Sequence, residues 1–522
     1  MSSLLAQAQR FLPEGVLHQD LPSRPVQYTA IAALVLFGWV LYQVLTPPAS
    51  QYPAINDDKA WFSLRAKAEY FKNAKQLLAD GSKKFTGPYN LVTDSGNVLM
   101  MPPELIDAIN AESKLTFNAY VTSVNLETFR TFREPPPGLF NEAVLKGLTR
   151  SLPKFTKGLS KEMEASLEES WGNSTEWRES DIKEDILQWV ARLSSHIFLG
   201  PRFSSNKEWL RIAISFTVDV MIASTICRFM PWPLRWPVER LLPLCRRVRR
   251  DYRACAKMLA PVLKERYDEI AAAEREGRQP NLPDDSIEWF RNAAHGRHYE
   301  ETDLQIALQL AAIHTTSDLL CQTILDICVN TDLIQPLREE AVEVLSKYGW
   351  KKLALTELRL LDSVFKESQR LKPIAMASMH REAIADVDLG NGIKIRKGES
   401  IGVSAHQMWE EDHYEEPEKY DGFRFVKRRK IAGLENRSLL VATSNDHLGF
   451  SHGKHACPGR FFAANEVKIA LVHLLLKYDM KLADPSMAKP KAYGVNQVTN
   501  PAARIQFRRR TPEIDIDNLA FD

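Results

Sequence analysis

The apolar and polar positions divide the chain into an apolar segment near the N-terminus and a long globular part. Residues 28–45 read YTAIAALVLFGWVLYQVL and contain no charged residue. A run of this length is just enough to cross a bilayer as a helix, and Tyr28, Trp39 and Tyr42 suit interfacial positions. The run begins far from Met1 and has few basic residues before it, so it fits a cleaved signal peptide poorly. The pattern predicts a retained transmembrane anchor.

Basic residues are distributed unequally around this segment. Arg10 and Arg24 precede it, whereas seven lysines and arginines, diluted by four acids, lie between it and residue 84. The positive-inside rule then places residues 1–27 in the lumen and the rest of the chain in the cytosol. This predicts a single-pass protein of the endoplasmic reticulum membrane. Residues 46–56 are rich in proline and cannot continue the helix, so we expect a hinge before the domain formed by residues 57–522.

Helical periodicity dominates the globular part. Apolar residues recur at spacings of three and four from about residue 104 to residue 371, which predicts helices. Two β-like runs surround Asp94-Ser95-Gly96 within residues 89–103, which predicts a hairpin. A second pattern that predicts strands and turns lies at residues 383–404. One helix face is predicted within residues 463–480, formed by Ala463, Val467, Ala470, Leu471, Leu474 and Leu475. The predicted fold is mainly α with a minor β region.

The composition narrows the possible classes of protein and partner but does not identify a function. The chain of 522 residues is 44% hydrophobic and 26% charged, as in ordinary globular proteins, and its net charge of +2 gives no general attraction to nucleic acid. We therefore expect no nucleic-acid partner. The six cysteines are scattered and do not resemble a disulfide framework, which favours a reducing compartment.

The stretch FSHGKHACPGRFF, residues 450–462, carries the first candidate chemistry. His447, His452, His455 and Cys457 are all types of zinc ligand, but they crowd into eleven residues, whereas structural zinc sites usually draw on two separate knuckles. A buried, inert thiol is a second interpretation. As a third, the helix expected after Cys457 would favour a thiolate through its positive N-terminus. The stretch alone leaves the three open.

The same stretch resembles the haem-binding loop of the cytochrome P450 family, Phe-x-x-Gly-x-(Arg/His)-x-Cys-x-Gly. The matching residues are Phe450, Gly453, His455, Cys457 and Gly459. The resemblance implies that Cys457 is the axial ligand of the haem iron. It also implies that His455 faces a haem carboxylate, while the two glycines let the backbone approach a flat, bulky group.

Two upstream segments extend the resemblance. In FKESQRLKP, Glu367 and Arg370 are spaced to pair on a helix, which by itself is typical of an exposed ion pair. The family has a structural Glu-x-x-Arg pair at this distance before the haem loop. PEKYDGFRF resembles the family's Pro-x-x-Phe-x-Pro-x-Arg-Phe segment, with Tyr420 for Phe and Gly422 for Pro. Arg424 is then predicted to complete a triad with Glu367 and Arg370.

LQLAAIHTTSDLL, residues 308–320, resembles the family's central helix, Ala-Gly-x-(Asp/Glu)-Thr-Thr, with Ala312 for Gly and His314 for the acid. The resemblance implies that Thr315, followed by Thr316, is the hydrogen-bond partner of the oxygen that is activated. Without it, hydroxyls that bond back to the preceding turn are expected. Because an imidazole can relay protons near neutral pH, a relay role for His314 is a hypothesis.

Further cations are candidates for the haem carboxylates or for a redox partner. Arg150, four residues after Lys146, resembles a Trp-x-x-x-Arg contact with Lys for Trp, and Arg381 follows His380. Each is equally compatible with a surface charge. Lys146, Arg150, Lys454 and the run at residues 427–430 could form a basic face for an acidic partner, or a solvated charge run.

The resemblance implies a haem-thiolate monooxygenase that holds haem b and uses O₂. Its electrons would come from NADPH through a separate NADPH–cytochrome P450 reductase, with cytochrome b5 as an alternative donor. The sequence of the haem loop is similar to that of filamentous-fungal members that oxidise terpenoids, such as ent-kaurene oxidases and indole-diterpene oxidases. A lipophilic substrate, hydroxylated once or several times, is expected. Steroid, alkaloid and polyketide scaffolds, a haem-thiolate isomerase or dehydratase, and a non-catalytic binding protein are the alternatives.

Residues expected near the substrate come from family position. Residues 227–244 contain Trp232 and Trp236, are broken by prolines and are expected to contact the bilayer interface over the substrate entrance. The alternative is a packed core loop. The predicted pocket residues are Ile313, Thr316, residues 373–379 and residues 493–497.

Overall fold

The computed structural model describes residues 38, 50–56, 63–123, 135–230 and 232–521. The predicted lumenal segment 1–27 lies outside the described residues, and so does the predicted anchor 28–45 apart from Gly38. The chain divides into two units, and the larger contains residues 52–59 and 63–522. The description below concerns this larger unit.

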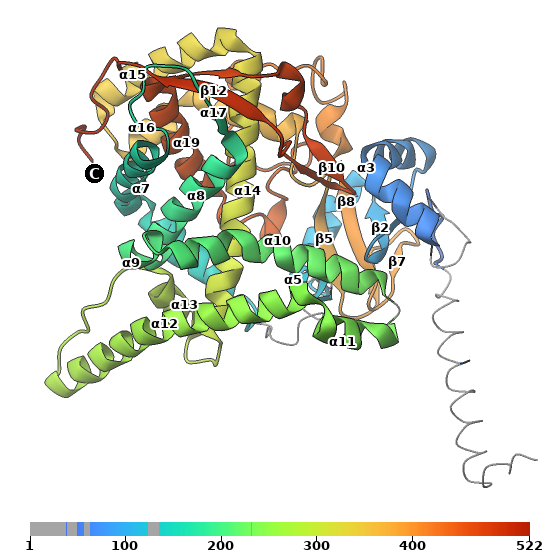
Figure 1. The fold of residues 1–522 in the computed structure, drawn as a ribbon. Helices are drawn as coiled ribbons and strands as arrows, with labels where there is room; N and C mark the ends of the chain where they lie inside the picture. The colour runs from blue at the N-terminus through green and yellow to red at the C-terminus, as the bar shows by residue number, and fades with distance from the viewer. Residues whose placement is uncertain (1–37, 39–49, 57–62, 124–134, 231, 522) are drawn as a thin grey trace, which may run out of the picture. The chain divides into compact units, whose positions relative to one another are not determined.

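Helices make up most of the larger unit (Figure 1). They are α3 (Leu64–Lys84), α4 (Ile106–Ala111), α5 (Phe117–Val121), α6 (Leu139–Glu142), α7 (Thr149–Ser170), α8 (Ile182–Leu199), α9 (Pro201–Ser204), α10 (Lys207–Phe229), α11 (Trp232–Leu241), α12 (Pro243–Glu276), α13 (Ser286–Ala294), α14 (Glu301–Val329), α15 (Ile334–Tyr348), α16 (Lys352–Glu357), α17 (Arg359–Leu371), α18 (Arg424–Arg428) and α19 (Arg460–Lys477). Short single turns add to these, among them η4 (Ala143–Leu148) and η7 (Gly453–His455).

The strands form four small sheets. The largest has the order β1-β2-β8-β5-β3, and a second has the order β4-β12-β9. Their bounds are β1 (Tyr89–Thr93), β2 (Gly96–Met101), β3 (Leu115–Thr116), β4 (Arg178–Asp181), β5 (Ala377–Ala383), β6 (Val387–Asp388), β7 (Lys394–Ile395), β8 (Ser400–Ser404), β9 (Tyr478–Leu482), β10 (Lys491–Tyr493), β11 (Asn496–Val498) and β12 (Arg504–Arg509). The predicted hairpin is confirmed, because β1 pairs with β2 around the turn that follows Thr93. The predicted fold class, mainly α with a minor β region, is confirmed as well.

The long helix α14 runs through the core and packs against α8, α10, α17 and α19. Its apolar residues surround the helix instead of forming one stripe, as expected of a fully buried helix. Between Glu301 and Cys328, the only exposed positions are Ala311 and Thr315, which are one turn apart. Ala311 and Thr315 therefore lie on the one side of α14 that the other described elements leave uncovered.

The last long helix differs from the prediction in two ways. α19 ends at Lys477, and Tyr478–Leu482 form β9, which pairs with β12. The helix is also buried on all sides, since α7, α14 and α15 pack around it. One of its buried polar residues forms an ion pair inside the core, since Lys468 Nζ lies 2.6 Å from Asp362 Oδ1. A prediction of one apolar face was therefore too narrow, because buried polar pairs interrupt the apolar pattern.

Two predicted irregular segments are ordered. Pro53 O accepts a hydrogen bond from Asn90 N at 2.7 Å, and the Asn56 side chain accepts one from Val92 N at 2.9 Å. This end of the predicted hinge 46–56 is therefore fixed to β1. Most of the predicted entrance loop 227–244 forms the helix α11 between α10 and α12. Of the described helices, α10 alone is long and apolar enough to span a membrane, and 56% of that apolar stretch is buried in the fold.

Candidate active site

The loop before α19 folds back on itself around Cys457. Cys457 N donates to Phe450 O at 2.9 Å, and Ser451 and Gly453 reverse the chain with φ of +59° and +76°. A Cβ on Gly453 would lie 2.2 Å from the Asn110 side chain, so this position requires glycine. In contrast, no described atom lies within 4 Å of where a Cβ on Gly459 would be. The loop is packed on the Gly453 side and open beside Gly459.

The electrostatic setting of Cys457 combines burial with hydrogen-bond donors. Burial raises the pKa of the thiol, while the backbone N–H groups of Gly459 and Arg460 and the Arg460 charge lower it. The guanidinium of Arg460 donates to Cys457 O at 2.8 Å and to Val441 O at 3.1 Å. Donors at a helix N-terminus stabilise a thiolate, the form of cysteine that binds metal ions. These donors favour the thiolate, although burial outweighs them and keeps the pKa of the thiol above its ordinary value.

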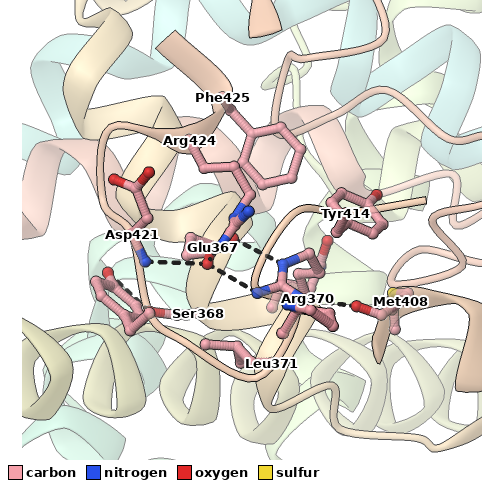
Figure 2. A network of polar contacts seen from close by, with 12 residues as sticks. Glu367, Ser368, Arg370, Leu371, Met408, Tyr414, Asp421, Arg424 and Phe425 are labelled. Carbon is pink, nitrogen blue, oxygen red and sulfur yellow. Dashed lines mark hydrogen bonds and ion pairs between the residues drawn. The ribbon is translucent and has the colours of Figure 1, made fainter. Parts of the chain in front are cut away.

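Glu367 is the centre of a buried ionic network (Figure 2). Its carboxylate accepts two hydrogen bonds from Arg370, both of 2.8 Å, and one from Arg424 Nε at 3.0 Å. Glu367 and Arg370 are 0% exposed and Arg424 is 9% exposed. The predicted triad is confirmed, and the alternative of an exposed ion pair is wrong.

The network fastens the segment before the cysteine loop to α17. Arg370 Nη1 donates to the carbonyl groups of Met408 and Pro417, both at 2.6 Å. Asp421 N donates to Glu367 Oε1 at 3.1 Å. Because α17 also packs against α14, one helix links the cysteine side of the core with the central helix.

The two polar candidates on α14 have different environments. Thr315 is exposed, and its hydroxyl donates to Ala311 O at 2.7 Å, which leaves the oxygen lone pairs available. His314 Nε2 pairs with Ile214 O on α10 at 2.8 Å, and burial lowers the pKa of the imidazole. Thr316 is buried. Thr315 thus marks the uncovered side of α14, while His314 connects the helix to α10.

Within the described part of the chain, Arg381 is a buried cation without a counter-ion. Its side chain is 1% exposed and Nη1 donates to His380 O at 2.7 Å, but Nε and Nη2 find no hydrogen-bond partner among the described residues. Burial lowers the pKa of Arg381 to about 10. Burial, followed by the charges of Arg381 and Lys454, lowers the pKa of His455 to about 4, so both cations lie within electrostatic range of the imidazole.

This cluster fits the carboxylates of a haem, because a buried guanidinium without a partner is costly unless an anion joins it. The local fold explains how Arg381 comes to be there. Met379 has a φ of +52°, and the pairing of β5 with β8 shifts register between Ser378 and Arg381. A bulge of this kind re-aims the following side chains.

Arg150 lies exposed in the first turn of α7, and Lys146 pairs with Glu142 at 2.8 Å.

The histidines near Cys457 are held separately. His447 Nε2 pairs with Gln369 Oε1 at 3.0 Å, and His452 Nδ1 pairs with Thr443 Oγ1 at 2.9 Å. Within the described ranges, no three His, Cys, Asp or Glu side chains gather as metal ligands. The geometry gives no support to the zinc interpretation.

The two predicted pocket segments lie together. Met376 N donates to Val495 O at 2.7 Å, and Gln497 N donates to Ile374 O at 2.8 Å. The strand after α17 and the β10–β11 hairpin therefore form one hydrogen-bonded unit. Ile313, in contrast, is fully buried in α14.

No pattern in the sequence predicts the residues that hold the turn at residues 439–442. Lys366 Nζ donates to Leu439 O at 2.8 Å and to Ala442 O at 2.9 Å, while Leu440 N donates to Asp362 Oδ2 at 2.7 Å. Asp362 and Lys366 are one turn apart on α17. Their spacing alone resembles that of any exposed charged pair, so burial was the missing signal.

Comparison with known proteins agrees with this geometry. The sequence matches the family model described as Cytochrome P450 over residues 138–509. The chain belongs to the cytochrome P450 family. It is 40% identical over 498 residues to cytochrome P450 monooxygenase hepE of Aspergillus oryzae, covering 93% of this chain and 90% of hepE. It is 37% identical over 508 residues to cytochrome P450 monooxygenase eqxH of Fusarium heterosporum, covering 94% and 97%.

A solved structure, retinoic acid-bound cyanobacterial CYP120A1, shares the P450 fold with a TM-score of 0.64 at 16% identity, covering 85% of this chain and 96% of that one. The predicted P450 fold and the predicted class of enzyme, a P450 monooxygenase, are confirmed. Members of this family carry haem iron, receive electrons from a redox partner and act on small molecules. The P450 described here is an oxidoreductase of that class.

Proposed function

We propose that this P450 is a membrane-anchored haem-thiolate monooxygenase that hydroxylates or multiply oxidises a lipophilic secondary metabolite, a terpenoid. One observation carries the proposal. The thiol of Cys457 lies among hydrogen-bond donors at the start of α19, in the same core as Arg381, a buried cation that lacks an anion. A thiolate ligand and a carboxylate-binding cation are the two contacts that haem b requires.

Cys457 would bind the iron of haem b, and the bound haem would supply the activation of O₂. Arg381 and His455 would bind its carboxylates, with Arg150 as a third candidate. Phe450, partly buried against the core, and the glycines of the loop fix the backbone around the cysteine. On the α14 side, Thr315 Oγ1 is the exposed hydroxyl that can hold and pass a proton.

The electrons are proposed to come from NADPH through a separate NADPH–cytochrome P450 reductase, with cytochrome b5 as an alternative donor. Lys454 is exposed next to the cysteine loop and supports a basic docking face for an acidic partner. Lys427 contributes less charge there, because it pairs with Asp421 at 2.8 Å. Arg428 lies at the end of the same short helix, α18.

Membrane attachment is proposed on two grounds. Residues 28–45 have the length and composition of an anchor, and α10 and α11 expose large apolar side chains. These are Val218, Met221, Ile222, Leu234, Trp236 and Leu241. The Arg240 guanidinium lies 5.3 Å from the centre of the Trp236 ring. Aromatic and basic side chains together suit the bilayer interface, so we place the catalytic domain, residues 57–522, on the cytosolic face of the endoplasmic reticulum.

A terpenoid substrate is supported by the sequence of the haem loop, and the fungal P450 monooxygenases among the relatives are consistent with a secondary metabolite. An indole-diterpene, steroid, alkaloid or polyketide scaffold is the alternative. The test uses microsomes that contain this P450 and a reductase, supplied with candidate terpenoids and ¹⁸O₂. One labelled oxygen atom should enter the product at each hydroxylation of a C–H bond to an alcohol, and only with NADPH. A product formed without NADPH or label would instead identify a haem-thiolate isomerase or dehydratase.

A further inference from the structure

The position of His314 leaves the proton supply of the reaction open. Insertion of one oxygen atom follows RH + O₂ + 2 e⁻ + 2 H⁺ → ROH + H₂O, so two protons must reach the oxygen for each product. His314 is bonded to Ile214 O on α10, and burial lowers the pKa of its imidazole, which therefore stays neutral at physiological pH. A neutral imidazole engaged with another helix is poorly suited to supply these protons.

Another acid lies close to Thr315 on α14. Asp318 follows Thr315 by three residues, which places the two side chains on the same side of the helix, separated by a rise of about 4.5 Å. The 100° rotation per residue puts Asp318 about 60° from Thr315, on the side where Ala311 also lies. Asp318 is partly buried. By its angle around the helix it therefore lies beside the exposed positions Ala311 and Thr315.

The other acids of α14 do not share this position. Glu301 and Asp303 are in the first turn. Asp326 is in the last turns and is bonded to Ser368 Oγ at 2.7 Å and to Lys372. Asp318 is thus the acid on α14 that lies nearest to Thr315 along the helix.

The surroundings of Asp318 connect it to the protein surface. Its Oδ1 accepts a hydrogen bond from Thr499 N at 2.7 Å, and its backbone carbonyl accepts one from Thr499 Oγ1 at 3.3 Å. Lys183, partly exposed in the first turn of α8, donates to Thr499 O at 3.1 Å. Burial raises the pKa of Asp318, while the Thr499 hydrogen bonds and the Lys183 charge lower it. Cys321, fully buried, is the other titratable group that faces it.

We propose that Asp318, in place of His314, is the acid that supplies protons to Thr315, and that it is reprotonated from solvent near Lys183. This inference rests on the proposed monooxygenase function. In each transfer the Asp318 carboxyl gives its proton to the Thr315 oxygen, and Thr315 passes its own hydroxyl proton on. The resulting carboxylate then takes a proton from water. Asp318 acts through Thr315 and does not itself touch the oxygen.

The first test does not depend on turnover. The carboxyl infrared band that is lost in Asp318→Asn should titrate, in the wild-type holoenzyme, at a pH clearly above the ordinary aspartate value of about 3.9. A band that titrates at the ordinary value would overturn the inference. Asparagine keeps an oxygen that can accept the Thr499 amide hydrogen bond, so we expect this variant to fold.

The second test compares turnover. Asp318→Asn should lower the rate of product formation about a hundredfold and enlarge the solvent deuterium isotope effect, because proton transfer becomes rate-limiting. Asp318→Glu, which keeps the acid, should restore most of the rate and the normal isotope effect, even if Asp318→Asn loses haem. Asp332→Asn, at an exposed acid beyond α14, is the matched control and should change neither.

An unchanged rate and isotope effect in Asp318→Asn would refute the inference, and so would finding these effects in His314→Gln instead. Failure of the proposed function would look different. It would appear in the wild type, as the absence of thiolate-ligated haem or of labelled oxygen in the product.

Discussion

Replacing Glu367 by glutamine tests whether the buried network holds the fold around the haem site. The carboxylate accepts hydrogen bonds from two guanidinium groups and from Asp421 N, and it is 0% exposed. Glutamine keeps the shape but removes the charge that compensates Arg370 and Arg424. Removing one partner from a buried ion pair costs about 3–5 kcal/mol. Since domains are typically stable by only about 5–15 kcal/mol, we expect a large loss.

The chain contains a matched control for this substitution. Glu208 and Arg211 have the same residue types and the same spacing on α10, at 2.9 Å, but their side chains are 57% and 43% exposed. Glu208→Gln should cost less than about 1 kcal/mol, because solvent screens an exposed pair. Urea unfolding followed by tryptophan fluorescence measures both variants against the wild type.

Haem content should follow the same order, with a loss in Glu367→Gln and none in Glu208→Gln. If Glu367→Gln unfolds within about 1 kcal/mol of the wild type, or no more readily than Glu208→Gln, then burial does not give this network its importance. The account of how α17 holds the segment before the cysteine loop would then be wrong.

Three further predictions concern a buried cation, a buried acid and the membrane anchor. Arg381→Met should stabilise the haem-free protein and weaken haem binding, because it removes an uncompensated buried charge and a carboxylate contact at once. Urea unfolding of the haem-free protein and haem titration measure the two effects. If the substitution destabilises the haem-free protein, the assignment of Arg381 is wrong. Glu466 is buried with Ser194 as its hydrogen-bond partner, and burial raises its pKa to about 8. The folded protein then keeps a proton that the unfolded chain releases near the ordinary value of about 4.3, so this stabilisation is complete below that pH and is lost as the pH rises towards 8. Glu466→Gln should gain stability on the wild type by up to about 1.4 kcal/mol per pH unit across that range, and a constant difference between pH 5 and 8 in urea unfolding would refute it. Deleting residues 1–45 should release the protein from membranes washed with alkaline carbonate, whereas retention would show that other surfaces suffice.

The fold class and the tight loop before α19 could be predicted because their signals are local, whereas the haem role of that loop was a prediction from the resemblance to the P450 family. The residue types from Phe450 to Gly459 dictate a tight loop before a helix, and glycine at 453 is required by a positive φ and a close neighbour. The alternation of residues around Asp94 likewise specifies a hairpin. In such segments neighbouring residues along the chain carry the whole pattern.

The environment of each site residue could not be predicted from spacing. Glu367 with Arg370 and Glu208 with Arg211 have the same spacing, yet the first pair is buried and the second exposed. Tertiary packing alone makes this difference. The side chain of His314 is held by a carbonyl group one hundred residues away in sequence.

Arg381 is a further residue whose environment could not be predicted from the sequence. The register of β5 shifts between Ser378 and Arg381, and nothing in the local sequence predicts the positive φ of Met379, a residue type that rarely has one. Asp318 became a candidate only when the structure showed that His314 was bound elsewhere. The family motif has its acid immediately before Thr315 and specifies no acid in the turn that follows.

The absorption spectrum of the reduced, carbon monoxide-bound protein tests the central claim most directly. The wild type should show the Soret band of thiolate-ligated haem, and Cys457→Ala should abolish it. Cys328→Ala, at a buried cysteine of α14, should leave the band in place. A wild type without this band, or a Cys457→Ala variant that keeps it, would contradict the assignment of Cys457 as the haem ligand.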